Sequence, residues 1–303
     1  MTARPSPQDR HRPAPDRSPA LEALIAAPAA WLADKVADPV VAARAEQAVL
    51  GAAAQFGGAA VPAALQRLAT AGTAGGLAPA DPVLRALMRA WMGAIASTRV
   101  HGVHHLGLVG RAPVVAVSNH LSFADTTATE CALLRAGGAA RAFADRMWAL
   151  AGPKVWDEPL HALASSGLNL VPTAQSRHVG ASSDAQAVLQ GLVLARERVR
   201  AGDPLLVYAE GTRSRTGRLG PFLAGVRHHL AVEGTVVLPI ALVGVDRLYP
   251  VDAQALVAGR IDVTIGAPIP VDDPLDALAR AHEALAALLP ERHRPAPGTP
   301  PIV

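Results

Sequence analysis

The feature that most constrains the fold of this 303-residue chain is an alternation that begins at Val100. Short runs of Val, Leu and Ile alternate there with longer segments of helical pattern, which is typical of a parallel sheet covered by helices on both faces. The sequence therefore predicts an α/β fold with a largely parallel central sheet flanked by helices. The expected strands are Pro113–Val117, Arg141–Ala144, Asn169–Val171, Pro204–Tyr208, Thr235–Val243 and Ile261–Ile265. The expected helices are Ser122–Arg135, Ser182–Arg200, Leu223–Glu233 and Asp273–Leu289.

The chain divides into four expected parts. Residues 1–18 and 290–303 are rich in proline and show no periodicity, so both are predicted to be disordered tails. Residues 19–97 carry helical signals and form an N-terminal helical extension. Residues 98–289 form the α/β domain.

The clearest helix of the extension opens with Asp81 as its N-cap and Pro82 as its first residue. An apolar stripe follows at helical spacing, with Arg85 and Arg89 lying away from it. This stripe either packs on the main domain or lies in a lipid interface, and the sequence leaves both interpretations open. Its members are Leu84, Leu87, Met88, Trp91, Met92 and Ile95.

Composition narrows the class of partner. Arginine supplies nearly all the positive charge, since Lys35 and Lys154 are the only lysines. A pI near 9.6 favours anionic partners such as phosphorylated small molecules or an anionic membrane surface. No basic run with interleaved aromatic residues occurs, so no nucleic-acid partner is expected. Cys131 is the single cysteine and cannot form an intramolecular disulfide.

The membrane signals predict a peripheral protein. The first twenty residues lack the apolar stretch of a signal peptide. The longest uncharged run, Gln47–Gln66, has the length of a spanning helix, but it is mostly Ala and Gly and contains Pro62. We therefore expect attachment to the cytoplasmic face of a membrane without a spanning helix.

Polar residues follow two of the expected strands, where ligands bind in parallel sheets. After the first of these strands, Asn119 and His120 precede Ser122 and Asp125, which have the spacing of a helix-capping pattern. The helix should then begin near Phe123 and leave His120 on the loop. From there its ring can fold back to meet Asp125, which would orient it as a general base. The alternative is that Asp125 only caps the helix.

The second segment, Glu210–Arg215, follows the strand that ends at Tyr208. It combines a carboxylate, a flexible glycine, hydroxyls and two guanidinium groups. Arginine suits bidentate contact with phosphate, and a glycine turn can present backbone N–H groups to an oxyanion. The alternative is a solvated loop with Glu–Arg pairs. Together the two segments predict a base beside an anion-binding group.

These blocks resemble the glycerolipid acyltransferase family whose bacterial prototype is 1-acylglycerol-3-phosphate acyltransferase. The first block, Asn-His-x-x-x-x-Asp, is matched by Asn119, His120 and Asp125. The third block, Glu-Gly-Thr-Arg-Ser, is matched by Glu210 to Ser214, with Pro221, Phe222 and Gly225 after it. The family's fourth block is an apolar strand that contains a proline, and it is matched by Val237 to Ile240. A closing segment typical of the family is matched by Val263 to Ile269. The blocks arrive in family order over residues 98–270.

The resemblance implies a reaction and its partners. The donor would be acyl-CoA or acyl-carrier protein, and the acceptor a hydroxyl of 1-acylglycerol-3-phosphate or another lysophospholipid. His120 would be the general base and Asp125 its orienting partner, with no cofactor and no metal. The substrate-binding residues would be Asn119, Glu210, Gly211, Thr212, Arg213, Ser214 and Thr173.

Two positions depart from the family pattern. The second block leads to Thr173, where the family usually has an arginine that contacts the acceptor phosphate. Leu223 follows Phe222, where a lysine is common. Both changes remove positive charge, and Arg177 or Arg215 is a candidate to replace it.

Three other readings compete. A non-catalytic lipid-binding protein would share the fold, although the intact His120 and Asp125 argue against it. A serine hydrolase is disfavoured because no Gly-x-Ser-x-Gly occurs in the sequence. A metal site from His101, His104 and His105 is disfavoured because a strand would place them on alternate faces.

Overall fold

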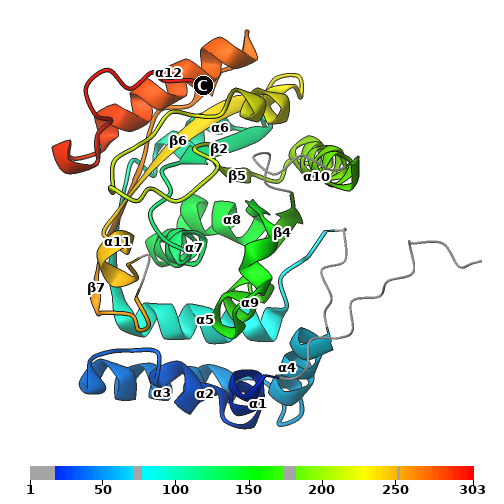
Figure 1. The fold of residues 1–303 in the computed structure, drawn as a ribbon, viewed down its shortest axis with the longest axis vertical. Coiled ribbons are helices and arrows are strands. Elements are labelled where there is room, and N and C mark those ends of the chain that lie inside the picture. Colours follow the sequence, from blue (N-terminus) through cyan, green and yellow to red (C-terminus); the bar gives the residue numbers. More distant parts are fainter. Residues whose placement is uncertain (1–17, 71–76, 174–181, 251–252) are drawn as a thin grey trace, which may run out of the picture.

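The computed structural model describes residues 18–70, 77–173, 182–250 and 253–303 (Figure 1). Within these ranges, eight strands form one sheet in the order β1-β7-β6-β2-β5-β3-β4, with β8 beside β6. The strands are β1 (Ala96–His101), β2 (Val114–Ser118), β3 (Trp148–Ala151), β4 (Asn169–Pro172), β5 (Leu205–Tyr208), β6 (Val236–Val243), β7 (Gly259–Ile265) and β8 (Ile269–Pro270). Strands β6, β2, β5, β3 and β4 run parallel, whereas β7 and β8 run antiparallel to β6.

Helices cover both faces of this sheet, so the predicted α/β fold is confirmed. One face packs on α5, α7 and α8, and the other on α10, α12 and η4. The helices are α1 (Pro19–Ala26), α2 (Pro28–Ala33), α3 (Pro39–Ala53), α4 (Ala60–Thr70), α5 (Pro82–Ile95), α6 (His105–Val109), α7 (Asp125–Ala136), α8 (Gly138–Arg146), α9 (Pro159–Ser166), α10 (Ser182–Arg200), α11 (Val245–Leu248) and α12 (Pro274–Leu288). Short 3₁₀ helices are η2 (Pro153–Trp156), η4 (Ala224–Leu230) and η5 (Glu291–His293).

The sheet differs from the prediction in three strands, which are β1, β3 and the two-residue β8. The prediction of a strand at Arg141–Ala144 is wrong, because this segment lies within α8. The strand of this region is β3, which follows α8 in the chain. The buried residues of α8 recur at helical spacing, at Ala140, Phe143 and Ala144. Alanine also has the highest helix propensity, so this segment favours a helix over a strand. Strand β1 was not expected, since the residues before Arg99 carry only helical signals in the sequence.

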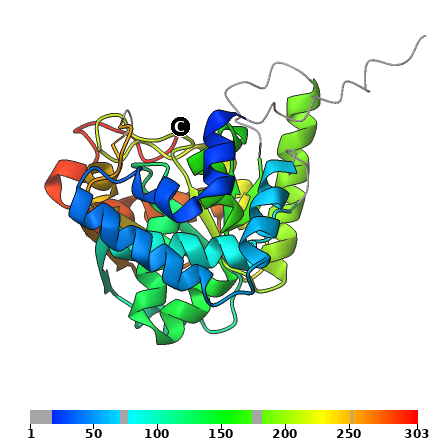
Figure 2. The same cartoon turned by 90° about the horizontal axis from the view of Figure 1, so that it is seen from below.

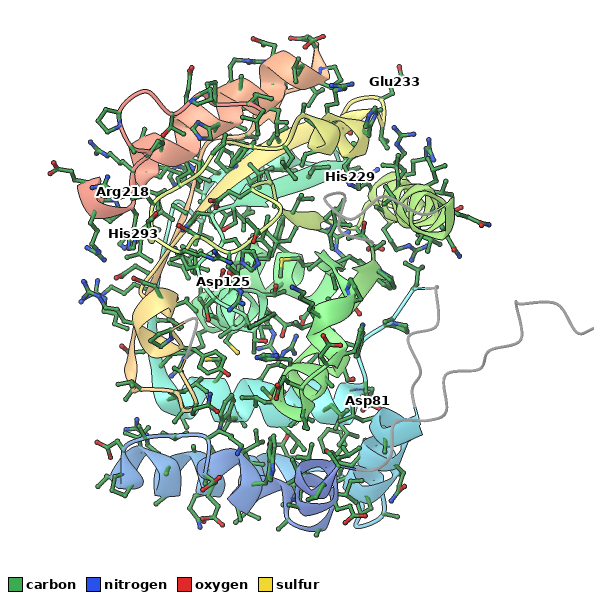
Figure 3. All side chains as sticks on the ribbon, in the orientation of Figure 1. Asp81, Asp125, Arg218, His229, Glu233 and His293 are labelled. Atoms are coloured by element: carbon green, nitrogen blue, oxygen red, sulfur yellow. The ribbon has the colours of Figure 1, made fainter. Side chains whose placement is uncertain are left out.

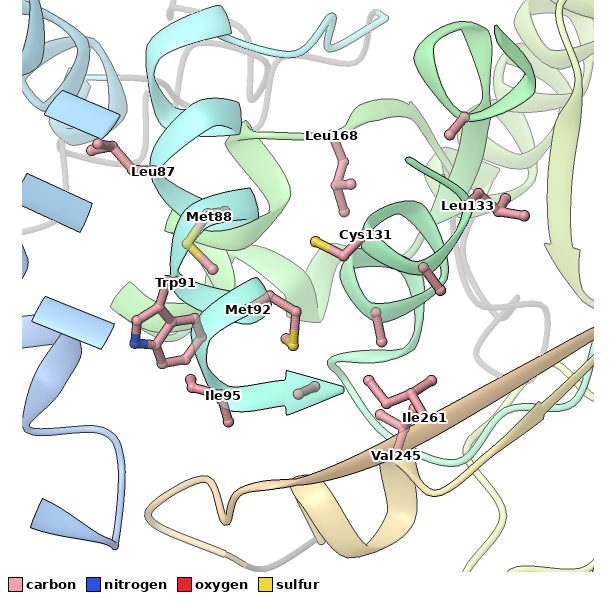
Figure 4. Packing of buried hydrophobic residues seen from close by; sticks show 14 of the residues in the cluster. Leu87, Met88, Trp91, Met92, Ile95, Cys131, Leu133, Leu168, Val245 and Ile261 are labelled. Carbon is pink, nitrogen blue, oxygen red and sulfur yellow. The ribbon is translucent and has the colours of Figure 1, made fainter. Parts of the chain in front are cut away.

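Helix α5 lies between the sheet domain and the layer formed by α1 to α4 (Figures 1 and 2). Every residue of its apolar stripe is buried. The Trp91 indole N–H donates to the Leu32 carbonyl at 2.9 Å. Figure 4 shows Cys131 of α7 among the buried residues around α5, and its Sγ lies 4.0 Å from the Arg89 carbonyl oxygen. The interpretation of this helix as a lipid-interface element is therefore wrong, because protein covers the face that would insert.

The arginines of α5 also turn inward. The carboxylate of Glu130, a buried residue of α7, accepts an ion pair from Arg85 at 2.8 Å and from Arg89 at 3.2 Å. Arg89 reaches Asp145 of α8 as well, at 3.1 Å. These pairs join α5 to the sheet domain. In the described ranges, none of the helices combines the length and the apolar character needed to cross a bilayer.

Residues 290–303, here named the C-terminal strap, are ordered and the prediction of a disordered tail is wrong for them. The strap runs beside the segment after β5. Phe222 N–H donates to the Pro301 carbonyl, and Val303 N–H donates back to the Phe222 carbonyl, both at 2.9 Å. His293 is only 2% exposed, and its carbonyl accepts from Leu219 N–H at 2.9 Å. Prolines favour an extended chain, and here that extended chain finds backbone partners. The other expected tail, residues 1–18, lies almost wholly outside the described residues.

Candidate active site

The two blocks follow neighbouring parallel strands. β2 lies next to β5, and their last residues, Ser118 and Tyr208, are level with each other. The carboxyl ends of parallel strands meet at one edge, so the segments after them converge. Ser214 N–H, in the third block, donates to the His120 carbonyl of the first block at 2.7 Å. The sequence therefore correctly predicted that these segments meet.

The first block is held by the carboxylate of Asp125. Its Oδ2 accepts from Leu121 N–H at 2.6 Å and from Ser122 N–H at 2.9 Å. Of the expected capping contacts, the bond from Ser122 N–H to Asp125 is present, whereas the Ser122 hydroxyl accepts from Ala124 N–H at 3.3 Å and the N-cap of α7 is Ala124. Regular helix nevertheless begins at Asp125 rather than near Phe123, because the preceding residues form a turn.

The same oxygen accepts from His120 Nδ1 at 2.8 Å. Asp125 is 1% exposed, and Figure 3 places it well inside the molecule. A carboxylate can only accept, so Nδ1 carries the hydrogen and Nε2 keeps a lone pair. The His120 side chain is 20% exposed, which gives a substrate access to this ring. The pairing predicted from the sequence is therefore present.

Tyr208 supports the imidazole from β5. Its ring stacks on that of His120 at 4.3 Å between centroids and 18° between planes. Its hydroxyl lies 3.0 Å from the Thr126 hydroxyl. Burial, followed by the charge of Asp125, raises the pKa of Tyr208 well above its usual value, so the phenol stays neutral. Sequence analysis missed this residue, although its place at the end of β5 was a usable signal.

Glu210 joins the two blocks instead of facing the open site. Its Oε1 accepts from His120 N–H at 2.9 Å, and its Oε2 accepts from Gly220 N–H at 2.8 Å. It is 6% exposed, and burial raises the pKa of its carboxyl from 4.5 to about 7. The structure therefore supports a positioning role in place of the expected substrate contact.

The turn of the third block is occupied by its own hydrogen bonds. Gly211 has φ +69°, and a Cβ there would collide with the Leu223 side chain. Gly211 N–H donates to the Tyr208 carbonyl at 3.0 Å, so it is not free for an oxyanion as expected. The Ser214 hydroxyl donates to the Arg218 carbonyl at 2.7 Å. Thr212 is exposed.

Asn119 is a second residue whose expected substrate contact has little support. It is 2% exposed. Its amide N–H donates to the Leu242 carbonyl and its amide oxygen accepts from Leu242 N–H, both at 2.8 Å. These bonds tie the end of β2 to β6. Asn119 thus fixes where His120 begins its loop.

Arg213 is the cation of the third block that reaches the first block. Its guanidinium carbon lies 3.7 Å from the centroid of the Phe123 ring. Phe123 in turn contacts His161 of α9, with 4.0 Å between ring centroids. Burial is the main cause that lowers the pKa of His161, and the charge of Arg213 adds to it.

Thr173 follows β4, the edge strand, three strands along from β2. Its N–H donates to the Ala151 carbonyl at 2.9 Å. The two candidate replacements for the missing arginine differ, because Arg215 is exposed and Arg177 lies outside the described residues.

An apolar pocket adjoins the first block where α7 begins. It is formed by α5, by the start of α7, by α9 and by the segment after α11. Its lining residues are Met88, Trp91, Met92, Phe123, Ala124, Thr127, Leu160, His161, Ala164, Tyr249 and Leu256. Part of the α5 stripe therefore lines a pocket, a role that neither sequence interpretation considered. The site combines an oriented imidazole, a guanidinium group and an apolar pocket, which suits a ligand with a hydroxyl, an anionic group and a hydrocarbon chain.

Comparison with known proteins agrees with this chemistry. Residues 97–243 match the family model described as Acyltransferase. The chain is 30% identical over 158 residues to a chloroplastic 1-acyl-sn-glycerol-3-phosphate acyltransferase of Brassica napus, covering 52% of this chain and 41% of that protein. It is 28% identical to the Arabidopsis thaliana protein of the same name, covering 52% and 39%. The chain thus spans about two fifths of these relatives.

Among solved structures, the 1-acyl-sn-glycerophosphate acyltransferase PlsC from Thermotoga maritima is similar, with 17% identity and a TM-score of 0.43. The alignment covers 62% of this chain and 68% of that one.

Proposed function

The chain belongs to the glycerolipid acyltransferase family, and from this premise we propose that it transfers a fatty acyl group from a thioester to the hydroxyl of a glycerolipid. The observation that carries the proposal is the 2.8 Å bond between His120 Nδ1 and Asp125 Oδ2, which leaves Nε2 as a base in a partly open site. A buried carboxylate behind the ring stabilises the imidazolium that forms when Nε2 takes a proton.

The reaction needs one base and no covalent acyl-enzyme. His120 Nε2 removes the proton of the acceptor hydroxyl while its oxygen attacks the thioester carbonyl. The C–S bond then breaks, and the imidazolium returns its proton to the leaving thiolate. The acceptor gains the acyl group as an ester, and the donor leaves as a free thiol. Asp125 keeps its hydrogen bond to Nδ1 throughout and does not take part in the proton transfer.

The acceptor is proposed to be a lysophospholipid such as 1-acylglycerol-3-phosphate, the substrate that the relatives' names give. Arg213 is the residue proposed to bind its phosphate, and its contact with Phe123 of the first block supports this. With threonine at position 173, we propose weak discrimination between a phosphomonoester acceptor and a phosphodiester one. A single arginine matches the one negative charge of a phosphodiester better than the nearly two charges of a phosphomonoester.

The donor is proposed to be acyl-CoA or acyl-carrier protein, and the apolar pocket beside Phe123 and Ala124 is the proposed entry point for the first methylenes of its hydrocarbon chain. Burial of each methylene there contributes about 0.8 kcal/mol.

Peripheral attachment to an anionic membrane, on its cytoplasmic face, is the proposed location. Since α5 is covered, the support comes from exposed arginines of the third block and the strap, Arg215, Arg218, Arg292 and Arg294. Binding to anionic vesicles should weaken as salt rises. Flotation at low and high salt tests this, and equal binding to neutral vesicles would remove the electrostatic part.

The central experiment incubates the purified protein with labelled acyl-CoA or acyl-carrier protein and a panel of acceptors. The panel holds lysophosphatidic acid, a lysophosphodiester and a monoacylglycerol, and the products are identified by mass. We expect diacyl products that depend on His120. Tight lysolipid binding without any product would favour the non-catalytic lipid-binding alternative.

A further inference from the structure

Three side chains from different parts of the chain form a stack at the rim of the apolar pocket. Phe123 is the aromatic residue of the first block, and it lies between the base and its orienting carboxylate in the sequence. The Arg213 guanidinium lies over its ring at 3.7 Å, a distance typical of a cation–π contact. The His161 ring contacts the same phenyl group at 4.0 Å, with 32° between the planes.

His161 suits this position because its ring is uncharged. Burial is the largest cause and lowers the pKa of His161; the charge of Arg213 lowers it further, whereas Glu158 and Asp157 act in the opposite direction. An uncharged imidazole does not repel the guanidinium group. Both of its ring nitrogens are buried without a hydrogen-bond partner among the described residues, so His161 contributes here through the packing of its ring against Phe123.

The stack ties the anion-binding group to the block that carries the base. An arginine side chain has many rotamers, and fixing it on binding costs conformational entropy. The third-block backbone is already anchored by Ser214 N–H on the His120 carbonyl, at 2.7 Å. Contact with Phe123 further restricts the Arg213 side chain. The position of the bound phosphate is thereby set relative to His120.

We propose that Phe123 is a positioning residue that prepares Arg213 for the phosphate of the acceptor and so determines specificity for phosphorylated acceptors. This inference deepens the proposed function and rests on it. It predicts that Phe123 acts on acceptor affinity through a charge, and not on the chemical step.

The test compares Phe123→Leu with wild type on lysophosphatidic acid and on a monoacylglycerol that lacks phosphate. A cation–π contact of ordinary strength predicts that KM for lysophosphatidic acid rises about three- to thirtyfold. Because Phe123 also lines the pocket proposed for the donor, both acceptors are assayed at saturating donor, and the result is the ratio of the KM for lysophosphatidic acid to the KM for monoacylglycerol, which should rise in Phe123→Leu. Phe123→Trp, which keeps an aromatic face, should restore the KM. Phe143→Leu, the same change at a buried position of α8, is the matched control.

A second arm makes the result independent of turnover. Binding of both lipids is measured by calorimetry in wild type, Phe123→Leu, Arg213→Gln and the double variant. If Phe123 acts through Arg213, its substitution has no further effect on lysophosphatidic acid binding once Arg213 is replaced. Equal losses for both lipids, additive losses in the double variant, or a fall in kcat alone would overturn the inference. A wild-type protein that binds both lipids but forms no product would instead refute the proposed function.

Discussion

The first and third blocks differ in the sequence separation of the hydrogen bonds that hold them. In the first block, one carboxylate binds two backbone N–H groups and an imidazole, all within the six residues from His120 to Asp125. In the third block, support comes from distant segments. Leu219 binds the strap at His293, 74 residues later by number, and Phe222 binds it at Pro301. The pair of base and orienting carboxylate is therefore formed within six residues, although Tyr208 and Glu210 also contact His120, whereas the loop after β5 depends in addition on the end of the chain.

This difference predicts how each block responds to substitution. Changes within the first block should act on the chemical step, because its contacts hold the base itself. Changes in the strap should act on the acceptor, because they loosen a loop that carries Arg213 but leave the bond between His120 and Asp125 intact.

The largest effect is expected for His120→Ala. Removing a general base lowers kcat by about two to four powers of ten. The melting temperature should change little, because the ring is partly exposed. Initial rates of acyl transfer and thermal unfolding measure both quantities. The matched control is His104→Ala, which removes an exposed imidazole and should leave the rate unaltered. A His120→Ala enzyme with near wild-type kcat would disprove the assignment of the base.

A smaller loss is expected for Asp125→Asn, about ten- to a thousandfold in kcat. The neutral amide no longer stabilises the imidazolium, and it can turn an N–H toward the Leu121 and Ser122 donors. Thermal stability should fall as well, because buried N–H groups lose a charged acceptor. Asp276→Asn is the control, since Asp276 also lies in the first turn of a helix but its side chain is 63% exposed. Losses of similar size in both variants would contradict a special role for the first block.

The strap is tested within the full chain by His293→Leu. His293 Nδ1 lies 2.6 Å from the Gly217 carbonyl, so the substitution removes a buried bond between strap and loop. We expect KM for lysophosphatidic acid to rise about three- to tenfold, the size of one hydrogen bond, with kcat little changed. Glu291→Gln changes the side chain of another exposed strap residue and serves as the control. A fall in kcat with an unchanged KM would break the distinction between the two blocks.

The same contrast explains what the sequence could predict. The pairing of His120 with Asp125 was accessible because it depends on local spacing at the end of a strand. The strap was predicted to be disordered because proline content does not reveal backbone partners that lie far along the chain. The α5 stripe stayed ambiguous because a buried helix and a lipid-facing helix have the same apolar pattern. Glu210 was predicted to contact the substrate because the sequence does not reveal that its carboxylate accepts from Gly220 N–H in the folded chain.

The last prediction concerns stability instead of turnover, and it tests Glu210, whose carboxyl connects the two blocks. Burial raises its pKa from 4.5 to about 7, so between these values the folded chain holds a proton that the unfolded chain releases. The free energy of unfolding should therefore decrease as pH rises from about 4.5 to about 7, and then level off. Glu210→Gln removes this titration, so its unfolding free energy should lack that decrease. Urea unfolding at pH 5 and at pH 7.5 measures the difference, with the exposed Glu233→Gln as control. We expect the stability of wild type relative to Glu210→Gln to be greatest at the lower pH. Identical pH dependence in the two proteins would mean that Glu210 ionises in the folded chain as it does in the unfolded one, and that its two backbone bonds offset its burial.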